Sequence, residues 1–328
     1  MNVLSPEQDL GANHLHVVSF SGGIGSWMAA KRVASQVGPE NVRLLFTDTL
    51  IEDADLYRFL VEAAANVLGG CDPAAVKQLA AIASDMPRPS TSGMLMRKVV
   101  LDSMRDQAKK VIPGLVWIQE GRTPWEVFTD LRYLGNSRID PCSRVLKREV
   151  ADAWLTANCD RAHTTIHVGI DWSEKHRFEG VGSKKGLRRR KAEQGWTYHA
   201  PLCEAPFISK DQMFLELDAA GIRRPRLYDL GAAHNNCGGG CIKQGQAGFA
   251  LLLKKDPAMY RIWMEGEEKL REHLGKNVTI LRDRSGGKVT PLPLREFINR
   301  VQCDAFDKTE FGGCGCFIDA DEDTQETK

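Results

Sequence analysis

A serine- and glycine-rich turn near the N-terminus could bind phosphate. The segment 16–26 reads HVVSFSGGIGS, an apolar run that passes directly into two adjacent glycines and a closing serine. Gly22 and Gly23 let the backbone bend close to an anion, while serine hydroxyls and the amide groups that open the next helix can donate hydrogen bonds to phosphate oxygens. The turn lacks the Gly-Lys-Ser/Thr of a Walker loop and is not Gly-x-Gly-x-x-Gly. The alternative to a phosphate loop is an ordinary tight connection between strand and helix. We predict ligand contacts from Ser19, Phe20, Ser21, Gly22, Gly23, Gly25 and Ser26.

Two cysteine pairs in the C-terminal part of the chain could hold a metal. The first pair has the spacing C-x3-C and the second C-x-C, and glycines surround both. Four thiolates suit zinc or an iron–sulfur cluster. Neither spacing is the C-x2-C of zinc ribbons, which favours a 4Fe-4S cluster and keeps zinc as the alternative; a redox dithiol or structural thiols also remain open. The predicted ligands are Cys237, Cys241, Cys314 and Cys316.

A third cysteine stands among cations in the segment DPCSRVLKR at 140–148. If this segment is helical, Arg144 and Lys147 lie near one face. Nearby cations favour the thiolate form of Cys142, so this residue could be a nucleophile or a metal ligand. The alternative is a half-buried structural cysteine.

Charged residues also follow two other predicted strands. Asp48 and Thr49 end the apolar run 42–47, and Gly169, Glu174 and Arg177 belong to a segment that begins in the run 164–170. Carboxylate and guanidinium three residues apart can orient each other and leave donors for phosphate oxygens. The alternatives are a helix N-cap for the aspartate and a surface ion pair of little energetic value.

The surrounding pattern predicts the elements that position these residues. Strands are expected at 14–20, 42–47, 115–119 and 164–170, with helices at 24–37 and 53–68. This alternation predicts an α/β fold, a Rossmann-like parallel sheet with helices on both faces, whose strand ends collect the ligand-binding residues. We expect this nucleotide-binding domain to cover residues 1–200. A Cys-rich helical subdomain with an acidic tail is expected at 201–328.

These motifs occur in an order that resembles the PP-loop ATP pyrophosphatases, the adenine nucleotide alpha hydrolase superfamily that includes the phosphoadenosine phosphosulfate (PAPS) reductases. The matching segments are the SGGIGS loop, Asp48-Thr49, the Cys-x4-Lys segment, the G…E..R segment, Pro201-Leu202 and Tyr228-x-x-Gly231. The resemblance implies binding of ATP with Mg²⁺, or of PAPS, with Asp48 and Thr49 beside the adenosine. It also implies catalytic roles for Cys142, Lys147, Glu174 and Arg177. Gly25 departs from the family aspartate, and Leu50 departs from the family glycine.

The resemblance implies a choice of activities. The loop start and the C-terminal Gly-Gly-Cys-Gly-Cys-Phe favour adenylation of an acceptor followed by sulfur insertion, as in DNA phosphorothioation or tRNA thiolation. A sulfur-donor protein such as a cysteine desulfurase would be a partner. The alternatives are a PAPS reductase that produces sulfite and a noncatalytic nucleotide-binding partner subunit.

Composition bounds the remaining possibilities. Among 328 residues, 44 Lys and Arg nearly balance 43 Asp and Glu, so DNA or RNA binding would need a local patch such as the basic run 184–191. No apolar run approaches the ~20 residues of a membrane span, and the first ten residues lack an export signal. We therefore expect a cytoplasmic protein with no membrane partner, in which the nine cysteines are reduced thiols or ligands.

Overall fold

The centre of the molecule is a five-stranded sheet in which every strand is parallel to its neighbours. The computed structural model describes residues 14–135, 139–285 and 287–312. The strands are β1 (Leu15–Ser19), β2 (Val42–Asp48), β3 (Leu115–Gln119), β4 (Thr164–His167) and β7 (Thr197–His199), in the order β3-β2-β1-β4-β7. The predicted α/β class and parallel sheet are confirmed.

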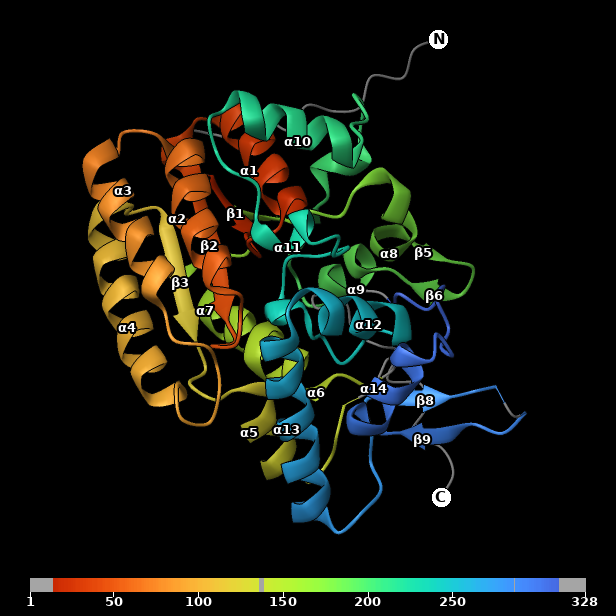
Figure 1. Ribbon diagram of the computed structural model, residues 1–328. Coiled ribbons are helices and arrows are strands. Elements are labelled where there is room, and N and C mark those ends of the chain that lie inside the picture. Colours follow the sequence, from red (N-terminus) through yellow and green to blue (C-terminus); the bar gives the residue numbers. More distant parts are fainter. Residues whose placement is uncertain (1–13, 136–138, 286, 313–328) are drawn as a thin grey trace.

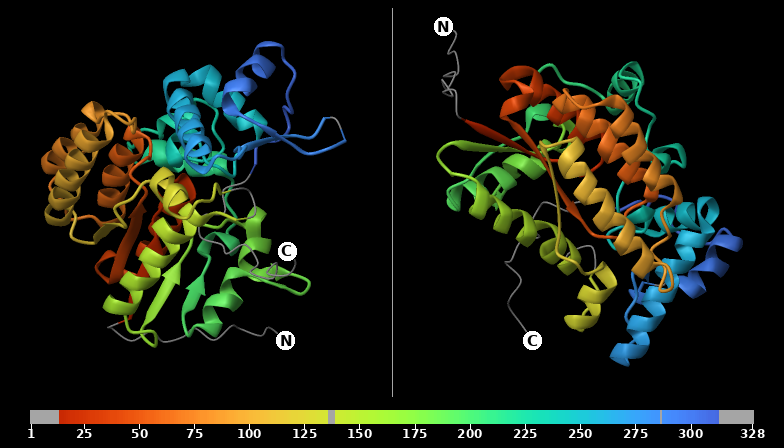
Figure 2. Two further views of the ribbon diagram at one scale, coloured as in Figure 1. Left: turned by 90° about the horizontal axis from the view of Figure 1, so that it is seen from below. Right: turned by 90° about the vertical axis from the view of Figure 1, so that its left-hand side faces the viewer.

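Helices cover both faces of this sheet because successive strand residues point to opposite sides. On one face, Val18, Leu44 and Phe46 pack against helices α1 (Ile24–Val37), α2 (Ala54–Leu68) and α4 (Met94–Val111). On the other, Val17 and Leu45 pack against α7 (Val150–Asn158). Helices α2, α4 and the intervening α3 (Pro73–Ile82) form a group at one side of the molecule (Figures 1 and 2).

The strand order places the topological switch point of the sheet between β1 and β4. From β1 the chain proceeds outward to β2 and β3, then returns to the opposite side of β1 as β4. In open parallel sheets, the connections that follow the two neighbouring strands at this point leave in opposite directions. Ligands bind between these two connections, at the carboxyl ends of the strands. The predicted phosphate loop follows β1, and Gly169 follows β4, so both lie at this switch point.

Shorter elements complete the central part. They are α5 (Pro124–Asp130), α6 (Pro141–Ser143), a π-helical turn (Arg144–Glu149), α8 (Lys175–Glu179), the hairpin β5 (Gly180–Val181) and β6 (Lys184–Lys185), α9 (Leu187–Glu193), α10 (Lys210–Ala219) and α11 (Arg226–Asp229). Leu202 and the α10 residues Met213 and Leu217 pack in the first core, which therefore extends beyond residue 200.

A second apolar core lies in the C-terminal part of the chain. It is built by α12 (Gln246–Lys255), α13 (Pro257–Leu274), α14 (Leu294–Gln302) and the hairpin β8 (Leu281–Asp283) and β9 (Thr290–Leu292), cyan to blue in Figure 1. Buried Glu267 on α13 joins these parts, because its carboxyl accepts hydrogen bonds from the amides of Ile280 at 2.8 Å and Leu294 at 2.7 Å. Burial raises the pKa of Glu267 to about 7. The C-terminal cysteines of the predicted subdomain, Cys314 and Cys316, lie outside the described residues.

No helix in the described part of the chain is both long enough and apolar enough to cross a membrane.

Candidate functional site

The loop after β1 turns sharply at a glycine. Gly22 has φ +77°, the left-handed region that favours glycine, and a Cβ there would lie 2.9 Å from Leu56 Cγ. Within the turn, Ser26 Oγ donates to the Gly23 carbonyl at 2.8 Å, and Ser21 Oγ donates to Ser26 Oγ at 3.4 Å. Helix α1 then begins without a side-chain cap. The first amide groups of α1 are thus presented at the switch point of the sheet, as an anion site requires.

Two glycines let α1 approach β4 closely. A Cβ on Gly25 would lie 2.9 Å from the Gly169 carbonyl oxygen, and a Cβ on Gly169 would lie 2.7 Å from the Ser26 amide nitrogen. An aspartate at position 25 would therefore require the backbone at the end of β4 to move. Gly169, predicted as a ligand contact, is used in this packing.

Of the two residues that precede the loop, Phe20 faces the protein interior and Ser19 is half-buried. Ser19 ends β1, and the Phe20 side chain is fully buried in the first core. The amide of Phe20 donates to the Leu45 carbonyl at 2.8 Å. These residues position the loop through the backbone.

A segment from the C-terminal half lies across the loop. We call residues 226–237 the covering segment. In it, the Tyr228 hydroxyl accepts a hydrogen bond from the Ile24 amide at 3.2 Å, and Asn235 Nδ2 donates to the Gly22 carbonyl at 2.7 Å. Lys210 from α10 stands over the Tyr228 ring at 4.5 Å. The amide that opens α1 thus already bonds a hydroxyl oxygen, at the position where a phosphate oxygen would bind.

Asp48 at the end of β2 is bound within the fold. Its fully buried carboxylate accepts hydrogen bonds from the Leu50 amide and the Tyr57 hydroxyl, both at 2.8 Å, and from Trp117 Nε1 at 3.0 Å. These hydrogen bonds lower the pKa of Asp48, but burial has the larger effect and raises this pKa above its usual value. Leu50 has φ +67°, a left-handed conformation that side chains disfavour, and Arg97 holds it through its carbonyl at 2.7 Å.

Three cysteines from two distant parts of the chain line one cavity. Cys142 comes from α6, and Cys237 and Cys241 come from the turn that ends the covering segment. The structure thus brings a predicted catalytic residue together with two predicted metal ligands. The same cavity is lined by Thr49, Pro124, Asp140, Ser143, Lys147, Ile242, Lys243 and Trp263.

Two buried ion pairs flank these thiols. Lys147 Nζ lies 3.5 Å from Glu52 Oε1, and Lys243 Nζ lies 2.8 Å from Asp140 Oδ2. Glu52 also accepts hydrogen bonds from the Thr49 hydroxyl at 2.9 Å and from the amide of Cys237, whose φ is +49°. Glu52 therefore fixes both the ammonium group and the backbone of one cysteine at the cavity.

The expectation that Arg144 and Lys147 share one face is wrong. The segment Arg144–Glu149 is a π-helix, whose wider turn rotates side chains away from α-helical positions. Lys147 is 5% exposed and lines the cavity, whereas Arg144 points to solvent and pairs with Glu149 at 2.7 Å.

The remaining predicted catalytic pair lies after β4. Glu174 and Arg177 form an ion pair, as the spacing predicts, and Asp171 caps the preceding turn by accepting from the Ser173 amide at 2.8 Å. They do not line the cysteine cavity.

Acidic neighbours partly neutralise the basic run 184–191. Glu193 pairs with Lys185 at 2.9 Å and Arg189 at 3.5 Å, and Asp152 pairs with Lys191 at 2.8 Å. This run therefore presents less charge to a nucleic acid than its sequence indicates.

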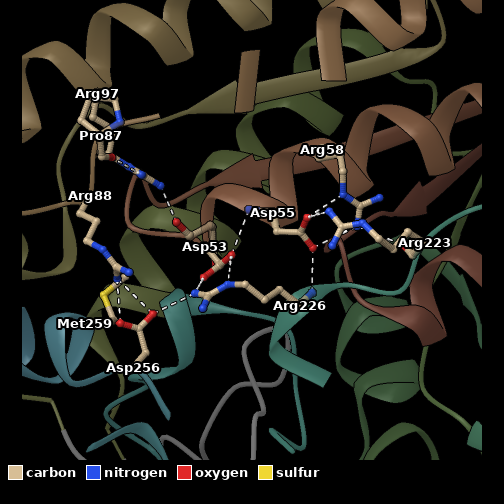
Figure 3. Close-up of polar contacts among 11 residues, drawn as sticks. Asp53, Asp55, Arg58, Pro87, Arg88, Arg97, Arg223, Arg226, Asp256 and Met259 are labelled. Atoms are coloured by element: carbon tan, nitrogen blue, oxygen red, sulfur yellow. Dashed lines mark hydrogen bonds and ion pairs between the residues drawn. The ribbon is translucent and has the colours of Figure 1, made fainter. Parts of the chain in front are cut away.

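An ion-pair network anchors the covering segment to both cores. Figure 3 shows Arg226 between Asp53 and Asp256, the capping residues of α2 and α13. Arg88 also binds Asp256, at 2.9 Å, and the Arg226 amide donates to Asp55 at 2.7 Å.

Several residues of this site were not predicted as site residues, among them Glu52 and Asn235. Glu52 follows the Asp48-Thr49 motif, and Asn235 stands two residues before Cys237, so nearness to predicted motifs was the available signal.

Across residues 14–135, 139–285 and 287–312, no three His, Cys, Asp or Glu side chains form a group that could hold a metal ion. Neither a family model nor a curated protein matches this chain.

Proposed function

We propose that this chain is a PP-loop ATP pyrophosphatase of the PAPS reductase-like family, which adenylates an acceptor oxygen so that sulfur can replace it. The observation that supports the proposal is that one segment of the chain contacts both the phosphate loop and the cysteine cavity. The covering segment contacts the phosphate loop through Asn235 and, two residues later, contributes Cys237 to the cysteine cavity.

The loop supplies the nucleotide chemistry in this proposal. Amides at the start of α1 and the Ser21 hydroxyl would stabilise the negative charge of the departing pyrophosphate, with Ser26 holding the turn through the Gly23 carbonyl and Mg²⁺ as the counterion of ATP. The acceptor oxygen would attack the α-phosphorus while the bond to the pyrophosphate oxygen breaks. A sulfur nucleophile would then displace AMP.

The cysteine cavity would supply the sulfur chemistry. Cys142, Cys237 and Cys241 line this one cavity, and cysteine thiolates are the soft donors that iron–sulfur clusters and zinc take. A cluster bound there would supply a site for sulfur binding and transfer.

In this proposal a fourth ligand would come from Cys314 or Cys316, which lie outside the described residues.

The test is release of pyrophosphate from ATP and Mg²⁺ by anaerobically purified protein. We expect release by the unaltered chain and at least a tenfold loss in Ser26→Ala, since the hydroxyl that supports the turn is removed. Ser35→Ala, on the exposed side of the same helix, is the matched control and should retain activity.

Other outcomes distinguish the alternatives. ATP binding by calorimetry without turnover would indicate a noncatalytic nucleotide-binding subunit. Sulfite production from PAPS and a thiol donor would indicate a reductase. Absence of binding to either nucleotide would overturn the proposal, and iron and sulfide analysis of the same sample separates a cluster from zinc.

A further inference from the structure

Asn235 contacts the phosphate loop through the nitrogen of its side-chain amide and not through the oxygen. The residue is 3% exposed, and its Nδ2 donates to the Gly22 carbonyl at 2.7 Å. Because that carbonyl can only accept, the amide nitrogen must face it and Oδ1 must face elsewhere. The orientation of the side chain is therefore fixed by its partner.

The Oδ1 atom of Asn235 is buried and has no hydrogen-bond partner among the described residues. A buried carbonyl oxygen without a donor loses the hydrogen bonds that water gives it in the unfolded chain, and this loss destabilises the fold. Native structures rarely retain such an atom unless a water, an ion or a ligand completes it. The same side chain contacts the left-handed turn of the loop through Nδ2, and this contact links the unpartnered oxygen to a ligand bound at the loop.

The missing partner must carry a hydrogen-bond donor. Fully ionised phosphate oxygens are acceptors and would repel a carbonyl oxygen, so an inorganic polyphosphate cannot complete this contact. A nucleotide carries hydroxyl and amino groups, and Mg²⁺ carries polarised water molecules that also donate.

We propose that Asn235 is a specificity-determining residue, whose Oδ1 accepts a hydrogen bond from a donor that a nucleotide complex brings and a bare polyphosphate lacks. This inference rests on the proposed binding of a nucleotide at the loop. Asn235 thus has two separate tasks: Nδ2 fixes the turn, and Oδ1 discriminates between ligands.

The experiment measures dissociation constants by calorimetry for ATP and for tripolyphosphate, each with Mg²⁺ and with a chelator. Each ligand is titrated into the unaltered full-length chain and into the full-length Asn235→Ala variant. Loss of the Gly22 contact should raise all four dissociation constants by a common factor. This factor cancels when the dissociation constants of two ligands are compared as a ratio.

The expected result is an extra loss of about tenfold for the ligands that provide the donor. If the donor belongs to the nucleoside, ATP loses affinity with and without Mg²⁺ while tripolyphosphate shows only the common factor. If it is water on the metal, both Mg²⁺ complexes lose affinity and both chelated ligands show only the common factor.

Equal losses for all four ligands would overturn the inference and leave Asn235 as a support for the turn. If the unaltered chain binds none of the four, the proposed function itself fails. Binding of ATP by the unaltered chain, followed by equal losses in the variant, refutes only the role of Oδ1.

A second variant separates the two tasks. Asn235→Asp keeps an acceptor but cannot donate to Gly22, so with chelator present it should weaken ATP and tripolyphosphate equally and preserve their ratio. An altered ratio would contradict the inference. Asn158→Ala, exposed on α7, is the control and should change no affinity.

Discussion

At the scale of single residues, backbone spacing decides what the phosphate loop can contain. The start of α1 lies so close to the end of β4 that Gly25 and Gly169 leave no space for a side chain. Position 25 therefore contributes backbone alone, and charge for a ligand must come from elsewhere. Lys210, which stands over the ring of the loop contact Tyr228, is a candidate for this charge.

We predict that Gly25→Ala lowers the free energy of unfolding by about 1–3 kcal/mol, because the new methyl group would displace the Gly169 carbonyl. Urea denaturation followed by circular dichroism measures this change. The control is Gly23→Ala, two residues earlier, where a Cβ would meet its nearest atom at 3.4 Å. Equal stability of Gly25→Ala and the unaltered chain would show that the two segments are not packed as described.

At the scale of secondary-structure elements, a row of imidazoles joins three neighbouring strands. His16 Nδ1 on β1 lies 2.9 Å from His167 Nε2 on β4, and His167 Nδ1 lies 3.2 Å from His199 Nδ1 on β7. Burial, and then the neighbouring histidines, lower the pKa of His16 to about 4 and that of His167 to about 2. The fold therefore favours the neutral imidazoles.

This row predicts loss of stability in acid. A histidine whose pKa is lower in the folded state binds protons first in the unfolded state, so its stabilisation is complete above pH 6.5 and falls as pH drops toward 4. For His16 we expect a loss on the order of 3 kcal/mol by pH 4. Urea midpoints measured from pH 7.5 to 4 should fall less steeply in His16→Gln.

The control for this prediction is His163→Gln, because His163 is exposed and pairs with Asp160 at the surface. It should follow the unaltered chain at every pH. If the slope of His16→Gln equals that of the unaltered chain, the histidine row does not control acid stability.

At the scale of the whole molecule, the covering segment connects the two apolar cores. Arg226 binds Asp53, which caps α2 in the first core, and Asp256, which caps α13 in the second, the latter at 2.9 Å (Figure 3). Burial raises the pKa of Asp256, but hydrogen bonds from Arg226 and Arg88 outweigh it and hold that pKa below its usual range. The covering segment therefore contacts both cores, the phosphate loop and the cysteine cavity.

We predict that Arg226→Met lowers the free energy of unfolding at pH 7 by about 2–3 kcal/mol, because two buried carboxylates lose a shared cation. Because the Asp256 pKa is held below its usual value in the folded state, the deficit should shrink as pH falls below 4, where this carboxylate of the unaltered chain also becomes protonated and its ion pair is lost. Urea denaturation at both pH values tests this.

Arg224→Met is the comparison, since Arg224 pairs with Asp218 on the surface. Its effect should stay below about 1 kcal/mol. Similar effects of the two substitutions would mean that the network does not join the cores.

Several features could be predicted from sequence because each depends on neighbouring residues. The apolar runs predicted the parallel strands, the paired glycines predicted the sharp turn after β1, and the spacing of Glu174 and Arg177 predicted their ion pair. The π-helix at Arg144–Glu149 was missed because a change of helical period leaves no distinct local pattern.

The sequence by itself determined the type of each element and the backbone freedom of the loop, since strand alternation and glycine conformations are local properties. Only the tertiary structure decided that Cys142 meets Cys237 and Cys241, and that Asn235 supports the turn at Gly22. These residues are far apart in the chain. Their meeting depends on how the two cores pack and on the charges buried between them, which no local pattern specifies.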